Sequence, residues 1–187
     1  TATGRRIVEA SRGNLKRVQL ELGGKGANIV FDDANLDAAV NGAAWAIFHN
    51  QGQACIAGSR LMLHDRIADA FLERFTALAN SIRLGDPRSP DTEMGPLTSA
   101  QHRDKVLSYV SIATEQGARV LAGGKAPGGE LSAGYYVAPT IVEAGPRDRV
   151  AQEEVFGPFV TVLRFGSDEE ALAIANATDY GLGSGLW

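Results

Sequence analysis

The stretch NQGQACIAG, residues 50–58, contains the only cysteine of the chain. A lone cysteine is most often a small buried hydrophobic residue. Cys55, however, lies among alanines and glycines that leave room for a substrate, and loop N–H groups there could stabilise a developing oxyanion. A nearby base or loop amides would increase the thiolate fraction of such a thiol. Cys55 is therefore a candidate nucleophile.

Two further stretches place carboxylates beside glycines. Glu21 lies in LELGGK, where it is either a catalytic base or a strand-end glutamate that faces water. Glu153 and Glu154 precede Phe156 and a Gly-Pro turn in QEEVFGPF. On its own, this second stretch is also compatible with a solvated acidic pair followed by a core aromatic residue.

The histidines offer a competing chemistry. His49 precedes Cys55 by six positions (55 − 49), and a Cys–His pair would indicate a cysteine hydrolase. We interpret His49 and His64 instead as the ends of a helix and of a strand. Three scattered histidines and one cysteine form no ligand cluster, so no metal site is predicted.

The elements that must position these residues alternate between strand and helix patterns. Strands are expected at 18–22, 27–31, 60–64, 118–123, 136–144 and 159–165. Helices are expected from Asn35 to His49–Asn50, with Asp33 or Asn35 as the cap, and at 67–81, 98–116 and 168–177. Loops are expected at the cysteine stretch, at 85–96 and at 123–135. This alternation predicts an α/β fold of three layers, in which helices flank a mostly parallel twisted sheet.

Composition limits the function classes. Of 187 residues, 44% are hydrophobic and 21% charged, with a net charge of −4, which is an ordinary globular balance. The acidic balance gives no electrostatic case for nucleic acid or an anionic membrane. No apolar run is long enough to span a bilayer and no signal peptide is present, and a single cysteine favours a reducing, cytoplasmic setting. Because the chain starts at Thr1 and stops in an apolar run, we expect a piece of a longer protein.

Taken together, LELGGK, NQGQACIAGSR and EEVFGP resemble three motifs of the NAD(P)-dependent aldehyde dehydrogenase superfamily. Cys55 follows Glu21 by 34 positions (55 − 21), the spacing typical of that family. NLKRVQLELGGK, IRLGDP, MGPL, YYVAPTI and NATDYGL resemble further family blocks in family order, so the resemblance spans the chain. It implies that residues 1–22 are the tail of a cofactor-binding domain and 23–187 an incomplete catalytic domain. It also implies NAD or NADP as cofactor, a small aldehyde as substrate, and a homo-oligomer as the full-length protein.

The resemblance also implies a role for each motif. Cys55 attacks the aldehyde, the hemithioacetal loses hydride to the nicotinamide, and the resulting thioester is hydrolysed to a carboxylic acid. The Cys55 backbone amide supplies half of the oxyanion hole, and Glu21 is the general base for the deacylating water.

The cofactor residues implied by the resemblance form a second group. Glu154 holds hydroxyls of the nicotinamide ribose, Phe156 packs beside the nicotinamide or its ribose, and Lys105 lies near the same ribose. Leu22 and Gly23 contact the nicotinamide through their backbone.

Departures from the family pattern leave rivals open. The second oxyanion donor of the family, an asparagine, belongs to a segment before Thr1, so we expect the chain alone to be inactive. A CoA-acylating relative typically lacks a glutamate at the position of Glu21. A non-catalytic family member is disfavoured because Cys55 and Glu21 are both retained.

Overall fold

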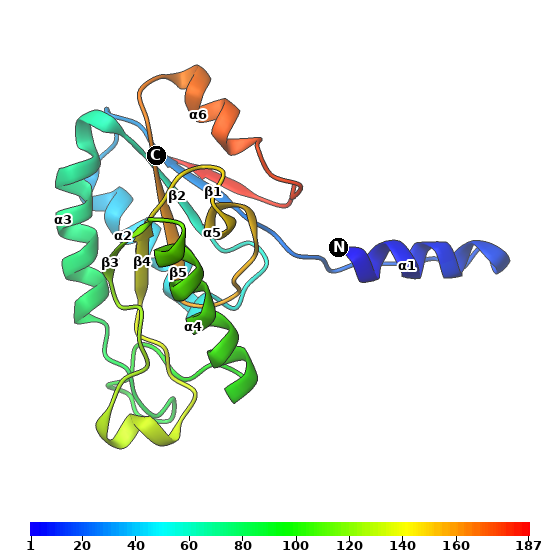
Figure 1. Ribbon diagram of the computed structural model, residues 1–187, viewed down its shortest axis with the longest axis horizontal. Coiled ribbons are helices and arrows are strands. Elements are labelled where there is room, and N and C mark those ends of the chain that lie inside the picture. Colours follow the sequence, from blue (N-terminus) through cyan, green and yellow to red (C-terminus); the bar gives the residue numbers. More distant parts are fainter.

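The computed structural model describes residues 1–187 and is built on one six-stranded sheet in the order β3-β4-β5-β2-β1-β6 (Figure 1). The strands are β1 (Ala27–Val30), β2 (Arg60–His64), β3 (Arg119–Ala122), β4 (Thr140–Glu143), β5 (Phe159–Phe165) and β6 (Ser184–Leu186). All neighbours are parallel except β3 and β4, which pair antiparallel at one edge. The predicted α/β fold with a mostly parallel sheet is confirmed.

Helices connect the strands. The α-helices are α1 (Ala2–Ser11), α2 (Leu36–Phe48), α3 (Asp65–Ser81), α4 (Ala100–Glu115), α5 (Arg149–Gln152) and α6 (Asp168–Ala175). Short 3₁₀ helices lie at η1 (Arg12–Asn14), η2 (His49–Gly52) and η3 (Gly129–Ala133). Side chains of Asn35, Ser99 and Ser167 cap α2, α4 and α6 by accepting a hydrogen bond from a backbone N–H of the first turn, as such residues do. None of the helices combines the length and the apolar character that a membrane crossing requires.

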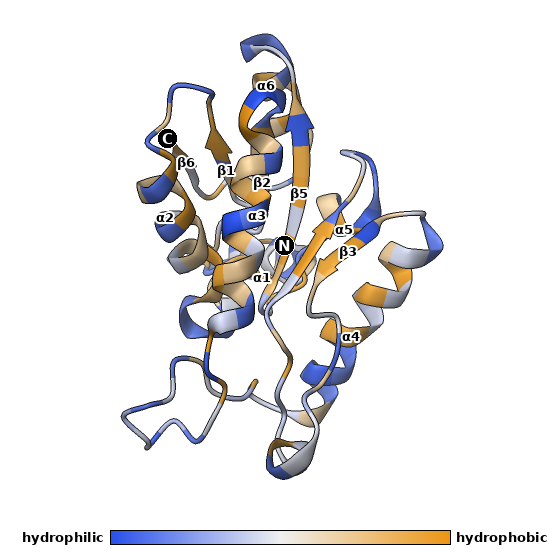
Figure 2. Cartoon of the chain, turned by 90° about the vertical axis from the view of Figure 1, so that its left-hand side faces the viewer, coloured by the Kyte–Doolittle hydropathy of each residue, from blue (hydrophilic) through white to orange (hydrophobic).

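The sheet is covered on both faces, because its strands carry apolar residues at successive positions. In β2, Leu61 and Leu63 pack with α2 and α3 on one face, whereas Met62 packs with α6 on the other. A separate cluster joins α4 to β4 and β5. Figure 2 shows the strands largely in the hydrophobic colour, while α3 and α4 carry both colours, as amphipathic helices do. These layers fix the loops at the strand ends.

The first helix lies apart from this body. Figure 1 shows α1 projecting away from the sheet, and Gly4 is its only buried residue. Gly4 faces the side chain of Leu22 in the extended segment that follows. The start of α1 also lies near the segment that follows α6, since Thr1 and Arg5 line one cavity together with Asn176 and Tyr180.

Several expected boundaries are corrected by the structure. The strand expected at 18–22 is wrong, since this segment is extended but pairs with no other strand. The strand expected at 136–144 is confined to β4, and the helix expected at 98–116 begins only at Ala100 because Ser99 is its cap. The helices α1 and α5 and the edge strand β6 were not predicted.

Candidate active site

The glycine pair of the LELGGK motif contacts residues of the other two sequence motifs. A Cβ added to Gly24 would lie 2.2 Å from the carbonyl oxygen of Cys55, and one added to Gly23 would lie 2.3 Å from Glu154 Oε2. No side chain fits at either position without displacing one of these groups. Gly23 and Gly24 are thus the surface on which the cysteine loop and the Glu154 carboxylate both rest.

The cysteine loop has an unusual backbone. After α2 ends, Asn50, Gln51 and Gly52 all adopt left-handed conformations, with φ of 50°, 56° and 67°. The Asn50 side chain donates to the carbonyl of Gln53 at 2.9 Å, which stabilises the reversal. The chain then turns again at Ala54–Ala57, and the half-buried Cys55 lies within that turn. The Cys55 backbone N–H donates to no acceptor in the protein.

The two adjacent glutamates of the third motif have different partners. Glu154 Oε1 accepts a hydrogen bond of 2.9 Å from the Gly24 N–H, which leaves Oε2 without a protein donor. Glu153 instead pairs with Arg149 and accepts from the Tyr109 hydroxyl at 2.8 Å. The Arg149 hydrogen bonds lower the pKa of Glu153, whereas burial raises the pKa of Tyr109 to about 12. Glu153 is structural, and Glu154 faces the glycine pair.

A buried lysine lies directly behind this surface. Lys25 is 2% exposed, and its Nζ has no hydrogen-bond partner. Burial, and next the charge of Arg60, lower its pKa to about 7, while Glu154 and Glu153 partly oppose that shift. Arg60 is also buried, but its guanidinium donates to the carbonyl oxygens of Lys25, Ile174 and Ala175.

The predicted cofactor residues Phe156 and Lys105 lie together. Both line a cavity of about 510 Å³ at the start of α4, next to His102. His102 Nε2 lies 2.6 Å from the carbonyl oxygen of Phe156, and the two rings meet edge-on with centroids 6.0 Å apart.

Glu21 and Leu22 are less tightly held. Glu21 is exposed and makes no hydrogen bond or ion pair. In this chain its side chain faces water, as the alternative interpretation of a strand-end glutamate expected. Leu22 is half-buried, and its side chain lies against Gly4. The structure therefore brings Gly23 against Glu154 and Gly24 against both Glu154 and the Cys55 carbonyl. It groups Phe156 with Lys105 and leaves the Glu21 side chain without a partner.

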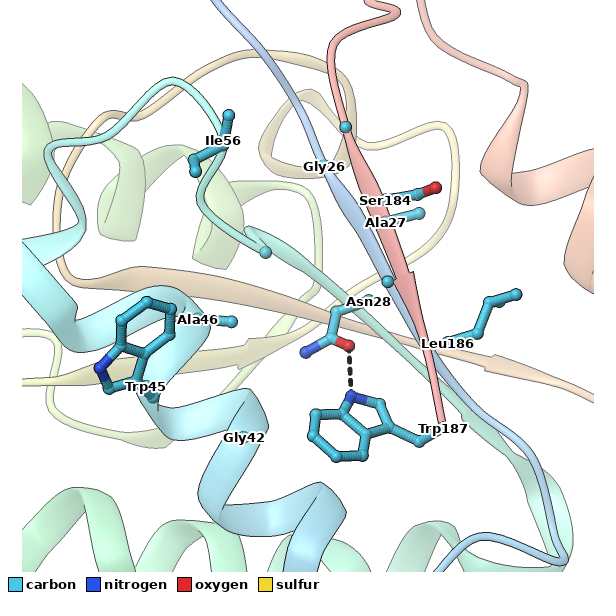
Figure 3. Close-up of a pocket in the computed structure, with 13 residues that line it drawn as sticks. Gly26, Ala27, Asn28, Gly42, Trp45, Ala46, Ile56, Ser184, Leu186 and Trp187 are labelled. Carbon is cyan, nitrogen blue, oxygen red and sulfur yellow. Dashed lines mark hydrogen bonds between the residues drawn. The ribbon is translucent and has the colours of Figure 1, made fainter.

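An apolar cavity adjoins the cysteine loop (Figure 3). Its volume is about 570 Å³, and its walls include Ile56, which follows Cys55, together with Trp45 and Trp187. The Trp187 indole N–H donates to Asn28 Oδ1 at 2.8 Å, and this bond holds the ring at the side of the cavity.

Two residues near the site were not predicted from the sequence. Lys25 ends the LELGGK motif. The sequence signal for its burial was its position among glycines just before a buried strand. A lysine in such a motif does not by itself indicate burial. His102 lies three residues before Lys105 on the same helix, which places both near one face. No three His, Cys, Asp or Glu side chains gather in a way that could hold a metal ion.

The fold and the site together define an α/β protein in which a glycine pair contacts a cysteine loop and a carboxylate, in segments that precede the parallel strands β1, β2 and β5. A family model described as the aldehyde dehydrogenase family matches residues 1–187. The chain therefore belongs to the aldehyde dehydrogenase family.

Individual relatives agree with this assignment. Betaine aldehyde dehydrogenase from Bacillus subtilis (strain 168) is 49% identical over 187 residues, which are 99% of this chain and 38% of that protein. The crystal structure of a putative aldehyde dehydrogenase from Burkholderia cenocepacia is 82% identical, with a TM-score of 0.98 over all of this chain and 38% of that one. The structure of PnpE in complex with nicotinamide adenine dinucleotide is 79% identical, with a TM-score of 0.97 and the same coverage. The chain thus spans 38% of the length of these relatives.

Proposed function

We propose that this chain forms the catalytic part of an NAD(P)-dependent dehydrogenase that oxidises an aldehyde to a free carboxylic acid. The observation that carries the proposal is the pair Gly23 and Gly24, which lies against both the Cys55 carbonyl and the Glu154 carboxylate. The cysteine loop and a polar group for the cofactor are thereby held by one segment, as catalysis by orientation requires.

Cys55 is the proposed nucleophile. Its thiolate adds to the aldehyde carbon, and the carbonyl oxygen becomes an oxyanion within a hemithioacetal. The Cys55 backbone N–H is free of protein acceptors and so is available to donate to that oxyanion. After hydride departs, the acyl group remains on the sulfur as a thioester.

Glu21 is the proposed general base for hydrolysis of the thioester. It precedes Leu22 and the glycine pair, and its carboxylate is not engaged by any donor of this chain. An unpaired carboxylate can take a proton from a water molecule that attacks the acyl carbon. We therefore propose hydrolysis, rather than transfer to CoA, as the second half of the reaction.

The residues present fit the nicotinamide end of a dinucleotide. Glu154 Oε2 has no protein donor, and a carboxylate oxygen of this kind can accept hydrogen bonds from ribose hydroxyls. Phe156 and Lys105 line one cavity and offer it an aromatic face and a positive charge. Leu22 and Gly23 complete this group through their backbone. When bound, NAD or NADP supplies the acceptor for the hydride.

Two further parts of the proposal concern organisation. We place the end of a cofactor-binding domain at residues 1–22 and the catalytic domain at 23–187, which is supported by the separation of α1 from the sheet. The apolar cavity beside Ile56 is proposed to receive the body of the aldehyde, since Ile56 follows Cys55 directly. The family resemblance alone supports a homo-oligomeric full-length protein.

The test uses the full-length protein that contains this chain. An aldehyde panel is assayed with NAD and NADP in parallel, by absorbance of the reduced cofactor, and the products are identified as free acid or, with CoA added, as acyl-CoA. We expect free acid from the wild type and no turnover from Cys55→Ser, with cofactor affinity nearly unchanged. If Cys55→Ser retains a tenth of the wild-type turnover, Cys55 is not the nucleophile.

A further inference from the structure

Phe156 has a strained backbone. Its φ of 64° lies in the left-handed region, which bulky residues rarely adopt. Gly157 follows and could take such a conformation without steric cost, yet it does not have a positive φ. Gly157 is required for another reason, because a Cβ there would lie 2.6 Å from the side chain of Val106. An aromatic residue is thus kept at the strained position, and strain of this kind concentrates at functional sites.

His102 contacts both the backbone and the side chain of Phe156. Its Nε2 lies 2.6 Å from the Phe156 carbonyl oxygen, and its ring meets the Phe156 ring edge-on. Because a carbonyl oxygen only accepts, Nε2 must carry the hydrogen. The histidine is itself fixed by the first turn of α4, where its backbone N–H donates to the Ser99 hydroxyl at 3.2 Å.

The strained turn also supports the cysteine loop. Gly52 has a φ of 67°, and a Cβ there would lie 2.0 Å from the Gly157 carbonyl oxygen. The Thr98 N–H, just before α4, donates to Gln53 Oε1 at 3.2 Å. The start of α4, the Phe156 turn and the loop that carries the thiol are therefore packed as one unit.

We propose that His102 is a positioning residue, whose Nε2–H holds the Phe156 carbonyl and so keeps the left-handed backbone that directs the Phe156 ring into the cofactor cavity. The proposal rests on the proposed function, in which Phe156 packs beside the nicotinamide ribose. Without the hydrogen bond, the Phe156 backbone relaxes to an ordinary conformation, and the ring leaves the position that the cofactor requires.

The first experiment compares three variants of the full-length protein. His102→Leu removes the donor, His102→Gln keeps an N–H donor, and Ser111→Leu is a control on an exposed position of the same helix whose side chain makes no hydrogen bond. NAD binding is followed by tryptophan fluorescence, and kcat and KM are measured with a good aldehyde substrate. We expect His102→Leu to weaken NAD binding about tenfold, which corresponds to about 1.4 kcal/mol, with a smaller change in kcat. His102→Gln should restore most of the affinity, and Ser111→Leu should leave it unchanged.

A second experiment reads the backbone without cofactor. Hydrogen exchange of the peptide spanning 153–159 is measured by mass spectrometry in the wild type, in His102→Leu, in Phe156→Gly and in the double variant. His102→Leu should accelerate exchange in the wild-type background. It should add nothing in the Phe156→Gly background, because glycine adopts the left-handed conformation unaided. Equal acceleration in both backgrounds would overturn the inference.

The outcomes separate the inference from the function on which it rests. If Phe156→Ala leaves NAD affinity unchanged, the proposed role of Phe156 fails, and the inference fails with it. If Phe156→Ala weakens NAD binding but His102→Leu does not, only the inference is overturned. If His102→Leu does not fold, the exchange and affinity of His102→Gln decide, since loss of affinity despite a retained N–H donor would also contradict the proposal.

Discussion

Replacing Lys25 with methionine is expected to stabilise the 187-residue chain. The Lys25 side chain is 2% exposed, and its Nζ has no hydrogen-bond partner. An ammonium group that leaves water without a partner costs folding free energy. Methionine is of similar length, is flexible and carries no charge, so it can occupy the same space without that cost.

The size of the effect follows from the pKa of Lys25, which burial lowers from 10.5 to about 7. Since each pKa unit corresponds to 1.36 kcal/mol, keeping the lysine charged in the folded chain costs on the order of 5 kcal/mol. The sign is fixed by proton binding. Between pH 7 and 10.5 the unfolded chain holds a proton that the folded chain lacks, so the free energy of unfolding rises with pH by up to about 1.4 kcal/mol per unit. Below pH 7 both states are protonated, and the cost is constant.

Urea denaturation at pH 7, 8 and 9 measures this difference. Lys25→Met should be more stable than the wild type by several kcal/mol at pH 7, and this advantage should shrink by roughly 1 kcal/mol per pH unit as the wild type gains stability. Lys125 is exposed, so Lys125→Met is the matched control and should change stability by less than about 0.5 kcal/mol. A Lys25→Met variant that is less stable, or whose advantage does not vary with pH, would refute the reasoning and show that the ammonium group has a stabilising partner.

Two further predictions concern the glycine pair and the proposed base. In the full-length protein, Glu21→Gln should give a rapid burst of reduced cofactor followed by a slow steady state, and intact mass spectrometry should detect an acyl adduct on Cys55; equal slowing of both phases without an adduct would mean that Glu21 does not act in deacylation. Gly24→Ala should abolish turnover and lower the free energy of unfolding by about 1–3 kcal/mol, because the new Cβ would meet the Cys55 carbonyl at 2.2 Å. Gly128→Ala, in open space, is its control and should behave like the wild type in both thermal melts and activity.

Much of the fold could be predicted because the spacing of apolar residues along the chain reflects which residues are buried. The helical spacing that starts at Asn35 and the apolar runs at 60–64 and 159–165 predicted α2, β2 and β5 within a residue or two. The segment 18–22 has the same composition as a strand but lacks a neighbour to pair with, and a missing partner is a tertiary property. The strand β6 is short and glycine-rich, and its pairing with β1 decides its conformation more than its own residues do.

The site was predicted less completely than the fold. Motif resemblance selected Cys55 and Glu154, and the structure brings both against the glycine pair. The motif resemblance could not indicate that Phe156 adopts a left-handed backbone, since a bulky side chain disfavours that conformation. Nor could the motif indicate that Lys25 is buried without a partner, because lysine is ordinarily exposed and burial is a tertiary property.

Arg60 links three segments that are far apart in the sequence. Its guanidinium joins the carbonyl oxygen of Lys25, 35 positions earlier, to those of Ile174 and Ala175, 114 and 115 positions later. Contacts so distant in sequence form late, because the intervening chain must first be ordered. A nascent chain that has not yet reached α6 has no acceptor for two of these three bonds, and Arg60 then has to stay in water. The full set of three Arg60 hydrogen bonds can therefore form only after synthesis has passed residue 175.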